Sequence, residues 1–313
     1  MAPREFPVDR DDEGARLEGF LRRRLAWPRT LALKALRKGW VRVDGRRARA
    51  DARLSAGQVV RVTNFALPLP GEDAPAARPA RPAPPAAVEA ARASLRRVEA
   101  DLVVSAKPAG VVVHAGSGHA WGWIDALAAA LGDPAPPVPV GRLDRDTSGL
   151  LVCGRTRAGA RRLFDALRAG TLARTYTAAV LGRLAGEGEV DLALEKRGAP
   201  GAERVEVDDE GRAARTRWRA LEARREGSLL ALELDTGRTH QIRAHLAAVG
   251  HPLLGDPRYG TDASAALTRR LDLGRLFLHA GALRLPREGD EAAVDTLDDP
   301  LPPELALAWA HVR

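Results

Sequence analysis

The residues best suited to chemistry in this chain form a charged run directly before an apolar one. Asp144 stands in this run, which reads Gly141-Arg142-Leu143-Asp144-Arg145-Asp146-Thr147-Ser148-Gly149-Leu150-Leu151-Val152. The Thr-Ser-Gly triplet predicts a turn, and the apolar residues after it predict a buried strand. Charged groups beside a buried strand are costly unless they have partners. The segment is therefore either a tightly paired structural corner or an active site built on a carboxylate.

A second segment combines turn residues with the start of a helix. It reads Thr236-Gly237-Arg238-Thr239-His240-Gln241-Ile242-Arg243-Ala244-His245-Leu246. Ile242, Leu246 and Val249 recur at helical spacing and predict one apolar face. Arg243 lies beside that face, and a cation at the edge of a buried face requires an anion. We expect Asp144 to be that anion.

Together the two segments resemble a known family, the pseudouridine synthases of the RluA/RluC/RluD type. Shorter matches follow in the family's order, from roughly Val98 to Ala280. A single short motif is weak evidence, but ordered motifs over most of a domain make the resemblance specific. The shorter matches are Lys107-Pro108-Ala109-Gly110 with His114, Arg174-Thr175-Tyr176, Gly250-His251-Pro252 with Gly255-Asp256, and Leu278-His279-Ala280.

The resemblance implies a reaction at uridine in RNA, in which the base leaves its N-glycosidic bond, rotates, and is rejoined through carbon 5. Asp144 matches the family's catalytic aspartate, which either attacks carbon 1′ of the sugar or acts as a base at carbon 2′ to give a glycal. Arg243 matches the arginine that pairs with this aspartate. From the residues alone, a structural ion pair between the two is the alternative. A glycosidase pair of Asp144 and Asp146 fits poorly, because carboxylates so close in sequence do not readily flank one sugar ring.

Two further residues match family positions that handle the base. Tyr176 matches a tyrosine that stacks near the target base, although a tyrosine in an apolar strand is more often a core residue. Arg142 matches an arginine that enters the RNA stack as the nucleotide leaves, with a plain phosphate contact as the alternative. The sequence departs from the family at Gly141, where histidine is frequent, and at Arg174, where lysine is common. We expect the glycine to alter loop geometry or substrate detail.

The composition favours an anionic partner. The 313 residues carry a formal net charge of +8, which favours nucleic acid first and a membrane surface second. No apolar run is long enough to span a membrane, and the charged N-terminus argues against a secretory signal, so we expect a cytoplasmic protein. The single cysteine, Cys153, excludes an internal disulfide and a multi-cysteine zinc site. Its apolar surroundings predict an inert thiol.

The N-terminal part predicts a small basic module. Apolar residues at helical spacing predict one helix over residues 15–25 and a second from Pro28 to Gly39. In residues 40–46, apolar and polar side chains alternate before an Asp-Gly pair, which is typical of a hairpin turn. Residues 59–62 predict another short strand. The module resembles the alpha-L RNA-binding domain, which is also found in ribosomal protein S-four. Six cations could share one RNA-binding face, unless they are only a solvated helix surface: Arg22, Arg23, Arg29, Lys34, Arg37 and Lys38.

Patterns along the chain divide it into three parts. Residues 1–64 form the small basic unit, of which residues 1–13 are predicted to fray. Residues 65–93 are rich in proline and alanine, which predicts a semi-stiff linker. Residues 94–313 mix strands and helices, and we expect an α+β catalytic domain with a largely antiparallel mixed sheet flanked by helices. The predicted strands are 102–105, 111–114, 150–153, 176–181 and 229–234, and the predicted helices are 119–132 and 160–167.

We therefore expect an RNA pseudouridine synthase that needs no cofactor and acts on large-subunit ribosomal RNA, because an N-terminal RNA-binding unit is typical of that branch. The reaction is redox-neutral, and the chain has neither a Walker loop nor a dinucleotide-binding spacing. His240 and His245 do not share a helix face, so we expect no metal site. Ser148 lacks the glycine pattern of a nucleophile elbow. The alternatives are a tRNA pseudouridine synthase and a non-catalytic RNA-binding or ribosome assembly factor. We expect a monomer.

Overall fold

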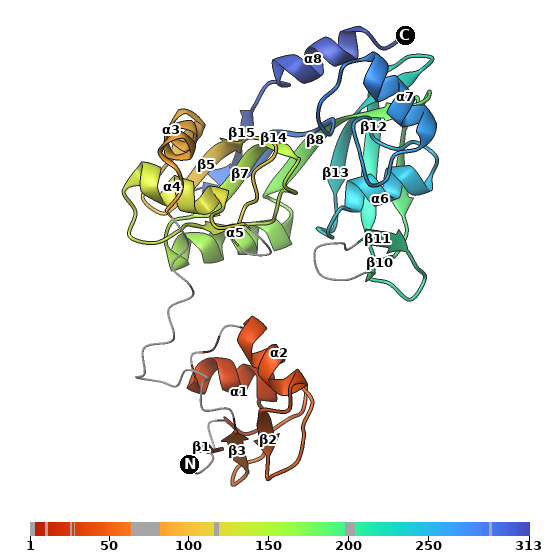
Figure 1. Ribbon diagram of the computed structural model, residues 1–313. Coiled ribbons are helices and arrows are strands. Elements are labelled where there is room, and N and C mark those ends of the chain that lie inside the picture. Colours follow the sequence, from red (N-terminus) through yellow and green to blue (C-terminus); the bar gives the residue numbers. More distant parts are fainter. Residues whose placement is uncertain are drawn as a thin grey trace. The chain divides into compact units, whose positions relative to one another are not determined.

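The chain folds as two units, Met1–Pro79 and Ala80–Arg313 (Figure 1). The computed structural model describes residues 4–9, 12–25, 27, 29–63, 82–115, 119–197, 204–287 and 290–313, without the side chains of residues 23, 29, 30 and 290–292. The first unit contains the basic module, and the second contains both of the segments that the sequence singles out.

In the first unit, two helices pack on a three-stranded sheet. Its elements are β1 (Arg4–Pro7), α1 (Leu17–Arg24), α2 (Arg29–Arg37), β2 (Val41–Val43) and β3 (Val59–Val62). The strand order is β1-β3-β2. The predicted apolar stripe of the first helix, Leu17, Phe20, Leu21 and Leu25, is buried and joins the same core as Val60 and Val62. This stripe fixes α1 against the sheet.

One prediction for this unit is wrong: residues 4–7 do not fray but form β1, which pairs antiparallel with β3. The predicted turn at Asp44-Gly45 is present, with a positive φ at both residues and two backbone hydrogen bonds between Val43 and Arg46. The longer pairing of β2 is with β3. Both β1 and β2 therefore pair with a strand that is distant in sequence, which local patterns do not reveal.

The predicted linker is helical at its C-terminal end. Residues 64–81 lie outside the described residues, but Pro85–Ala93 forms helix α3, which packs against α4 (Trp123–Leu131). Ala83, Ala87 and Ala91 turn one small face toward the core. Alanine has the highest helix propensity, and proline suits the first helical turn. The composition that predicts a linker therefore also supports a short helix.

The second unit is built on one ten-stranded sheet, which confirms the predicted α+β class. The main path runs β4-β5-β7-β14-β8-β13-β12-β9, with β6 paired to β7 and β15 paired to β14. All neighbours are antiparallel except β7 and β14, which run parallel. The strands are β4 (Leu95–Val98), β5 (Leu102–Lys107), β6 (Val138–Pro139), β7 (Ser148–Gly154), β8 (Ala173–Leu181), β9 (Glu187–Asp191), β12 (Arg215–Ala223), β13 (Gly227–Leu234), β14 (Leu278–Arg287) and β15 (Asp290–Asp298), and a separate hairpin pairs β10 (Leu194–Arg197) with β11 (Arg204–Val207).

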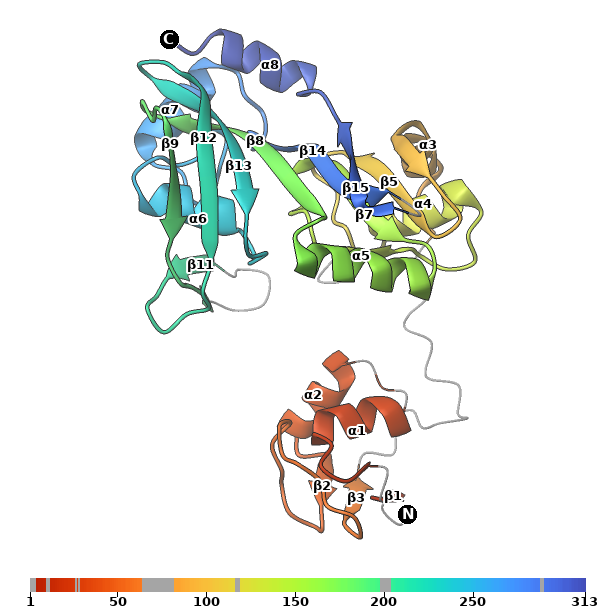
Figure 2. The same ribbon diagram turned by 180° about the vertical axis from the view of Figure 1, so that it is seen from behind.

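Helices cover both faces of this sheet (Figure 2). In β5 and β7, Val103, Leu151 and Cys153 pack toward α3 and α4, whereas the alternate residues Leu102 and Val152 pack toward α5 (Arg157–Ala169). Because side chains alternate between the two faces of a strand, a strand that is covered on both faces has a continuous apolar run in its sequence. Helix α6 (Gln241–Ala248) joins the core of the first face, and α7 (Asp262–Arg270) and α8 (Pro303–Ala310) pack around Ala179 on the other face. In the described part of the chain, no helix is both long and apolar enough to cross a membrane.

The predicted strand Val111–His114 is wrong. Its carbonyl groups serve other partners: those of Val112 and Val113 accept the first backbone N–H groups of α4, and that of Val111 accepts a hydrogen bond from Lys107. The segment therefore acts as an N-terminal cap for α4 and has no ladder to join.

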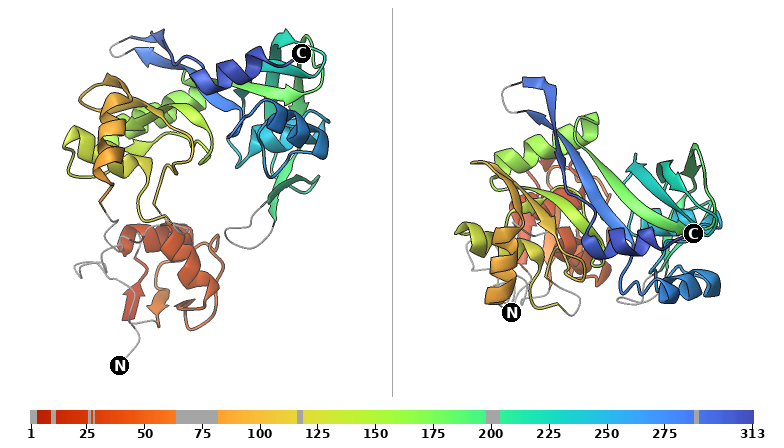
Figure 3. Two further views of the ribbon diagram at one scale, coloured as in Figure 1. Left: turned by 45° about the horizontal axis from the view of Figure 1, so that its top comes forward. Right: turned by 90° about the horizontal axis from the view of Figure 1, so that it is seen from above.

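Strand β14 connects the two halves of the sheet and fixes the register around Asp144 (Figure 3). Ala280 of β14 lies opposite Gly149 of β7 on one side and Tyr176 of β8 on the other. A Cβ atom at Gly149, whose φ is +108°, would collide with the backbone of Ala280, so only glycine permits this approach. The loop before β7 and the ring of Tyr176 are thereby brought to the same level.

Candidate active site

Lys107 anchors the loop that carries Asp144. Its side chain, 1% exposed at the end of β5, donates hydrogen bonds to the carbonyls of Pro108, Val111 and Arg145 at 2.7, 2.8 and 3.1 Å. These acceptors match the three N–H groups of an ammonium, although burial lowers the pKa of Lys107 to about 7. The contact to Arg145 fixes the backbone directly after Asp144.

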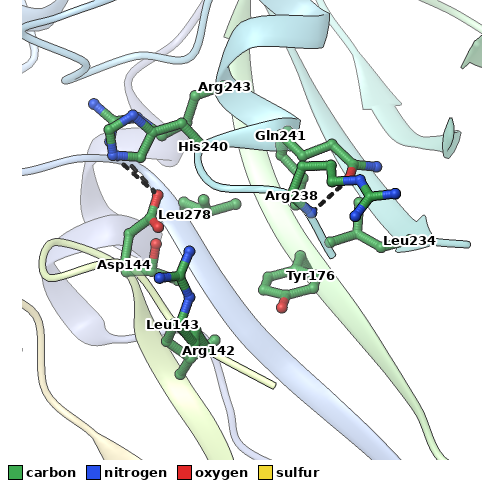
Figure 4. Close-up of a pocket in the computed structure, with 12 residues that line it drawn as sticks. Arg142, Leu143, Asp144, Tyr176, Leu234, Arg238, His240, Gln241, Arg243 and Leu278 are labelled. Atoms are coloured by element: carbon green, nitrogen blue, oxygen red, sulfur yellow. Dashed lines mark hydrogen bonds and ion pairs between the residues drawn. The ribbon is translucent and has the colours of Figure 1, made fainter. Parts of the chain in front are cut away.

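Two side chains from the start of α6 face the Asp144 carboxylate (Figure 4). Nη1 of Arg243 lies 3.5 Å from Oδ2 of Asp144, and Nε2 of His240 lies 3.9 Å from the same oxygen. Arg243 is 5% exposed, whereas Asp144 keeps part of its surface open. The carboxylate is therefore held by cations or N–H groups on one side and remains accessible on the other.

The closest partner of Arg243 is Asp256, which the sequence reasoning did not anticipate. The guanidinium donates from Nε and Nη2 to the two carboxylate oxygens of Asp256, at 2.7 and 2.8 Å. Burial works against the charge of Arg243, but the bond to Asp256 raises its pKa. This fork geometry fixes the guanidinium plane and leaves Nη1 directed at Asp144. Arg243 therefore bridges two carboxylates.

His240 is oriented by Tyr259. The phenol oxygen of Tyr259 accepts the backbone N–H of Val205 at 2.9 Å and lies 3.1 Å from Nδ1 of His240. Burial lowers the pKa of His240, while the charge of Asp144 acts in the opposite direction. Nδ1 of the ring faces the Tyr259 phenol, and Nε2 faces Asp144. His240 has a φ of +52°, an uncommon backbone for a residue other than glycine that recurs at functional sites.

These groups line one pocket together with Tyr176 of β8 and Arg142 (Figure 4). The Tyr176 ring is almost buried, and burial raises the pKa of its phenol, so the ring is neutral at neutral pH. The free space in the pocket is about 40 Å³, and the pocket opens to solvent at a mouth.

Arg142 lies at that mouth. Its Nη2 donates a 2.6 Å hydrogen bond to the hydroxyl of Thr239, and the guanidinium is exposed. This bond joins the loop before β7 to the turn before α6. Asp146, two residues after Asp144, pairs instead with its neighbour Arg145 at 2.9 Å.

Behind the loop, a buried hydrogen-bond chain fixes the start of β7. Arg275 donates to the Ser148 hydroxyl at 2.6 Å, and this hydroxyl lies 2.9 Å from Nδ1 of His279. Nε2 of His279 in turn lies 3.1 Å from the carbonyl of Asp299. Although serine, histidine and aspartate meet here, Ser148 is buried and already accepts a hydrogen bond. The cluster holds the backbone in place and offers no free nucleophile.

The remaining predicted residues lie elsewhere. The side chains of Arg22, Lys34, Arg37 and Lys38 are exposed on the helices of the first unit, whereas those of Arg23 and Arg29 lie outside the described residues. Among the residues that the structure describes, no group of three or more histidine, cysteine or acidic side chains could hold a metal ion. Cys153 is buried, as predicted, and burial raises the pKa of its thiol to about 12.

Comparison with known proteins bears directly on this site. Residues 101–248, which include the Asp144 loop, Tyr176 and the start of α6, match the RNA pseudouridylate synthase family model. The ribosomal large subunit pseudouridine synthase C of Vibrio cholerae is 34% identical over 98% of this chain and 96% of its own length. The chain belongs to the RNA pseudouridine synthase family. The synthase is also 35% identical to the ribosomal large subunit pseudouridine synthase C of Escherichia coli strain K12, over 90% of this chain and 88% of that protein.

The fold of the synthase is shared with a solved human structure. Human RNA Pseudouridylate Synthase Domain Containing 4 superposes with a TM-score of 0.58 at 23% identity, covering 71% of this chain and 94% of that one. At this level of identity the likeness concerns the fold alone. It agrees with the mixed sheet and flanking helices of the second unit.

In the synthase, residues that are far apart in sequence meet in one pocket. Asp144, Tyr176, Arg243 and Arg142 line it together, as the sequence motifs imply. Sequence reasoning assigned no role to Asp256 or Lys107, although both stand in short family motifs, and it overlooked Tyr259. Their roles depend on contacts with Arg243, Arg145 and His240 that only the folded chain reveals.

Proposed function

We propose that this synthase converts uridine to pseudouridine in large-subunit ribosomal RNA, in the cytoplasm, with Asp144 as its catalytic residue. The observation that carries the proposal is the accessible Asp144 carboxylate, 3.5 Å from a buried guanidinium, in a pocket that Tyr176 also lines. The choice of RNA is supported by relatives that are named for the large ribosomal subunit and match nearly the whole chain.

The reaction requires one carboxylate and a closed site from the protein, and little else. The bond from N1 of uracil to C1′ breaks, the base turns, and a bond from C5 to C1′ forms. The C5 hydrogen leaves as a proton, and N1 takes up a proton in its place. Electrons balance without an oxidant or reductant. Asp144 either attacks C1′ or removes a proton from C2′. Arg243 balances the charge of the carboxylate once RNA has displaced water from the pocket, and Asp256 keeps that guanidinium in place.

Tyr176 and Arg142 are proposed to manage the extruded base. Extrusion costs a few kcal/mol of stacking and pairing, which contacts in the pocket must offset. The neutral ring of Tyr176 offers a face for the uracil. Arg142 lies at the mouth and donates a hydrogen bond to Thr239. Breaking that bond would open the mouth and free a planar guanidinium to fill the gap left in the RNA stack.

The RNA substrate can be identified by mapping pseudouridines in cells with and without this synthase. We expect one or more pseudouridines to disappear from large-subunit ribosomal RNA in the deletion strain and to return with the wild-type gene. A gene encoding Asp144→Asn serves as the matched control and should not restore them. Loss confined to tRNA would replace the ribosomal substrate with the alternative one.

We further propose that the first unit is an RNA-binding domain, like the alpha-L module that its sequence resembles. Arg22 on α1 and Lys34, Arg37 and Lys38 on α2 are exposed. Nη1 of Arg22 lies 3.9 Å from Oε1 of Glu18, a distance typical of a weak surface ion pair. Exposed cations on two adjacent helices suit phosphate groups, which give affinity with little sequence information.

Neutralising this surface is expected to weaken RNA binding and flatten its salt dependence. In the triple variant Arg22→Gln/Lys34→Gln/Lys38→Gln, the slope of log K against log salt should fall by roughly 0.7–0.9 for each lost phosphate contact. The matched control is Arg157→Gln/Arg161→Gln/Arg168→Gln, which removes three exposed charges from α5. Equal slopes for the wild type and the first triple variant would show that this surface does not contact RNA.

A further inference from the structure

The two positions at which the sequence departs from the family pattern touch each other. Gly141 has a φ of +78°, and Arg174 of β8 extends across it. A Cβ atom at residue 141 would lie 2.5 Å from Nη1, 3.2 Å from Nη2 and 3.3 Å from Cζ of Arg174. The guanidinium therefore fills the space that a side chain at residue 141 would need.

Arg174 also joins two parts of the pocket. Its Nη2 donates a hydrogen bond to the carbonyl of Val140, the residue directly before Gly141. Its charge acts on the phenol of Tyr176, where it opposes the effect of burial on the phenol pKa, and the charge of Asp144 reaches the same phenol. Arg174 thus links the start of the Asp144 loop to the ring that lines the pocket opposite it.

The residue types at both positions are required for this contact. The guanidinium of Arg174 is a planar fork that reaches the Val140 carbonyl and spreads over Gly141, whereas a lysine presents one compact ammonium. The guanidinium is wide, and it can lie against the backbone at residue 141 only because Gly141 has no side chain. The left-handed backbone at Gly141 also disfavours any other residue.

We propose that Gly141 and Arg174 are a matched pair, in which the missing side chain at residue 141 admits the guanidinium that positions the Asp144 loop against Tyr176. Arg174 is a positioning residue and not a catalytic one, because it acts through the loop and the tyrosine. The inference rests on the proposed function of this pocket.

A double-mutant cycle tests the pair by the release of tritium from carbon 5 of uridine in RNA. We expect Gly141→Ala and Arg174→Lys each to lower kcat about tenfold, with little change in KM. This loss lies within the roughly 100-fold that a 1 Å displacement of reacting groups can cause. In the double variant, the alanine should add almost no loss, because the guanidinium that it would displace is already gone. The expected coupling is therefore about tenfold, which lies within the range found for residues in contact.

Gly170→Ala is the matched control. Gly170 has a φ of +74°, and a Cβ atom there would meet nothing within 4 Å, so this variant introduces the same backbone strain without a clash. It should keep the wild-type kcat. If the double variant instead shows the product of the two single losses, or if neither single variant loses activity, the proposed pair is overturned.

A second readout separates this inference from the proposed function. The chain has only two tyrosines, so the ¹³Cζ resonance of Tyr176 can be assigned by its persistence in Tyr259→Phe. Both single variants should shift this resonance, and the two shifts should not add in the double variant. If the wild type released no tritium, the proposed function would fail, but the resonance would still decide for or against the pair. An unshifted resonance in folded Arg174→Lys would overturn it.

Discussion

Asp256→Asn is expected to lower the free energy of unfolding by about 3–5 kcal/mol and to remove most of the activity, because it breaks a buried ion pair by removing one partner. Both hydrogen bonds from Arg243 to Asp256 would be weakened, and of its two carboxylate partners among the described residues the buried guanidinium would keep Asp144. Arg243 could then turn fully toward Asp144 and block it, or leave the pocket. Either outcome disturbs the carboxylate on which the proposed chemistry depends.

Urea unfolding and tritium release measure the two effects. The matched control is Asp191→Asn, which breaks the ion pair of Asp191 with Arg215 at 2.6 Å, where both side chains are about half exposed. Exposed pairs contribute about 0–1 kcal/mol, so this control should remain close to the wild type in stability and activity. Equal losses for the two variants would show that Asp256 has no special role in supporting Arg243.

The stability difference between the wild type and Asp256→Asn should depend on pH. Burial alone would raise the pKa of Asp256, but Arg243 and the backbone N–H groups of Arg258 and Tyr259 lower it below its ordinary value. The unfolded chain therefore binds more protons between the two pKa values, and stability rises with pH across that window. The wild-type advantage should be complete above roughly pH 4 and should decrease as the pH falls below it. A constant difference down to pH 2 would contradict this.

Short sequence patterns correctly predicted the helices and strands whose structure depends on residues that are close together in the sequence. The continuous apolar run Leu102-Val103-Val104 is typical of a strand that is buried on both faces, and helices cover both faces of the sheet there. The predicted strands at β7, β8 and β13 and the helices α1, α4 and α5 are confirmed for the same reason. Strand β1 and the segment 111–114 were mispredicted, since their structure depends on β3 and on the first turn of α4.

For the site, the sequence supplied the residue types but not the contacts between them. The motif resemblance pointed to Asp144, Tyr176 and Arg243, and the register of β14 explains how two of them reach the same level. That Arg243 would bind Asp256 more closely than Asp144 could not be predicted, because either carboxylate satisfies the same charge. The contact of Gly141 with Arg174 was equally hidden, since no pattern connects a loop glycine to a strand arginine.

Asp144→Asn is expected to lower the rate of pseudouridine formation by roughly 10⁴-fold or more. Asparagine keeps the size of the side chain but removes the charge that both candidate mechanisms need, whether Asp144 attacks C1′ or takes a proton from C2′. RNA binding should change little, because the exposed cations on α1 and α2 remain. Asp146→Asn is the matched control. It changes a carboxylate that pairs with Arg145, and it should lose less than about tenfold.

The most direct measurement is the release of tritium from carbon 5 of uridine in large-subunit ribosomal RNA, under single-turnover conditions with excess enzyme. The wild type should release tritium in proportion to the pseudouridine formed. Asp144→Asn should release none above background while still binding the RNA, and Asp146→Asn should behave nearly as the wild type does. Tritium release by Asp144→Asn at the wild-type rate would contradict the assignment of the chemistry to this carboxylate.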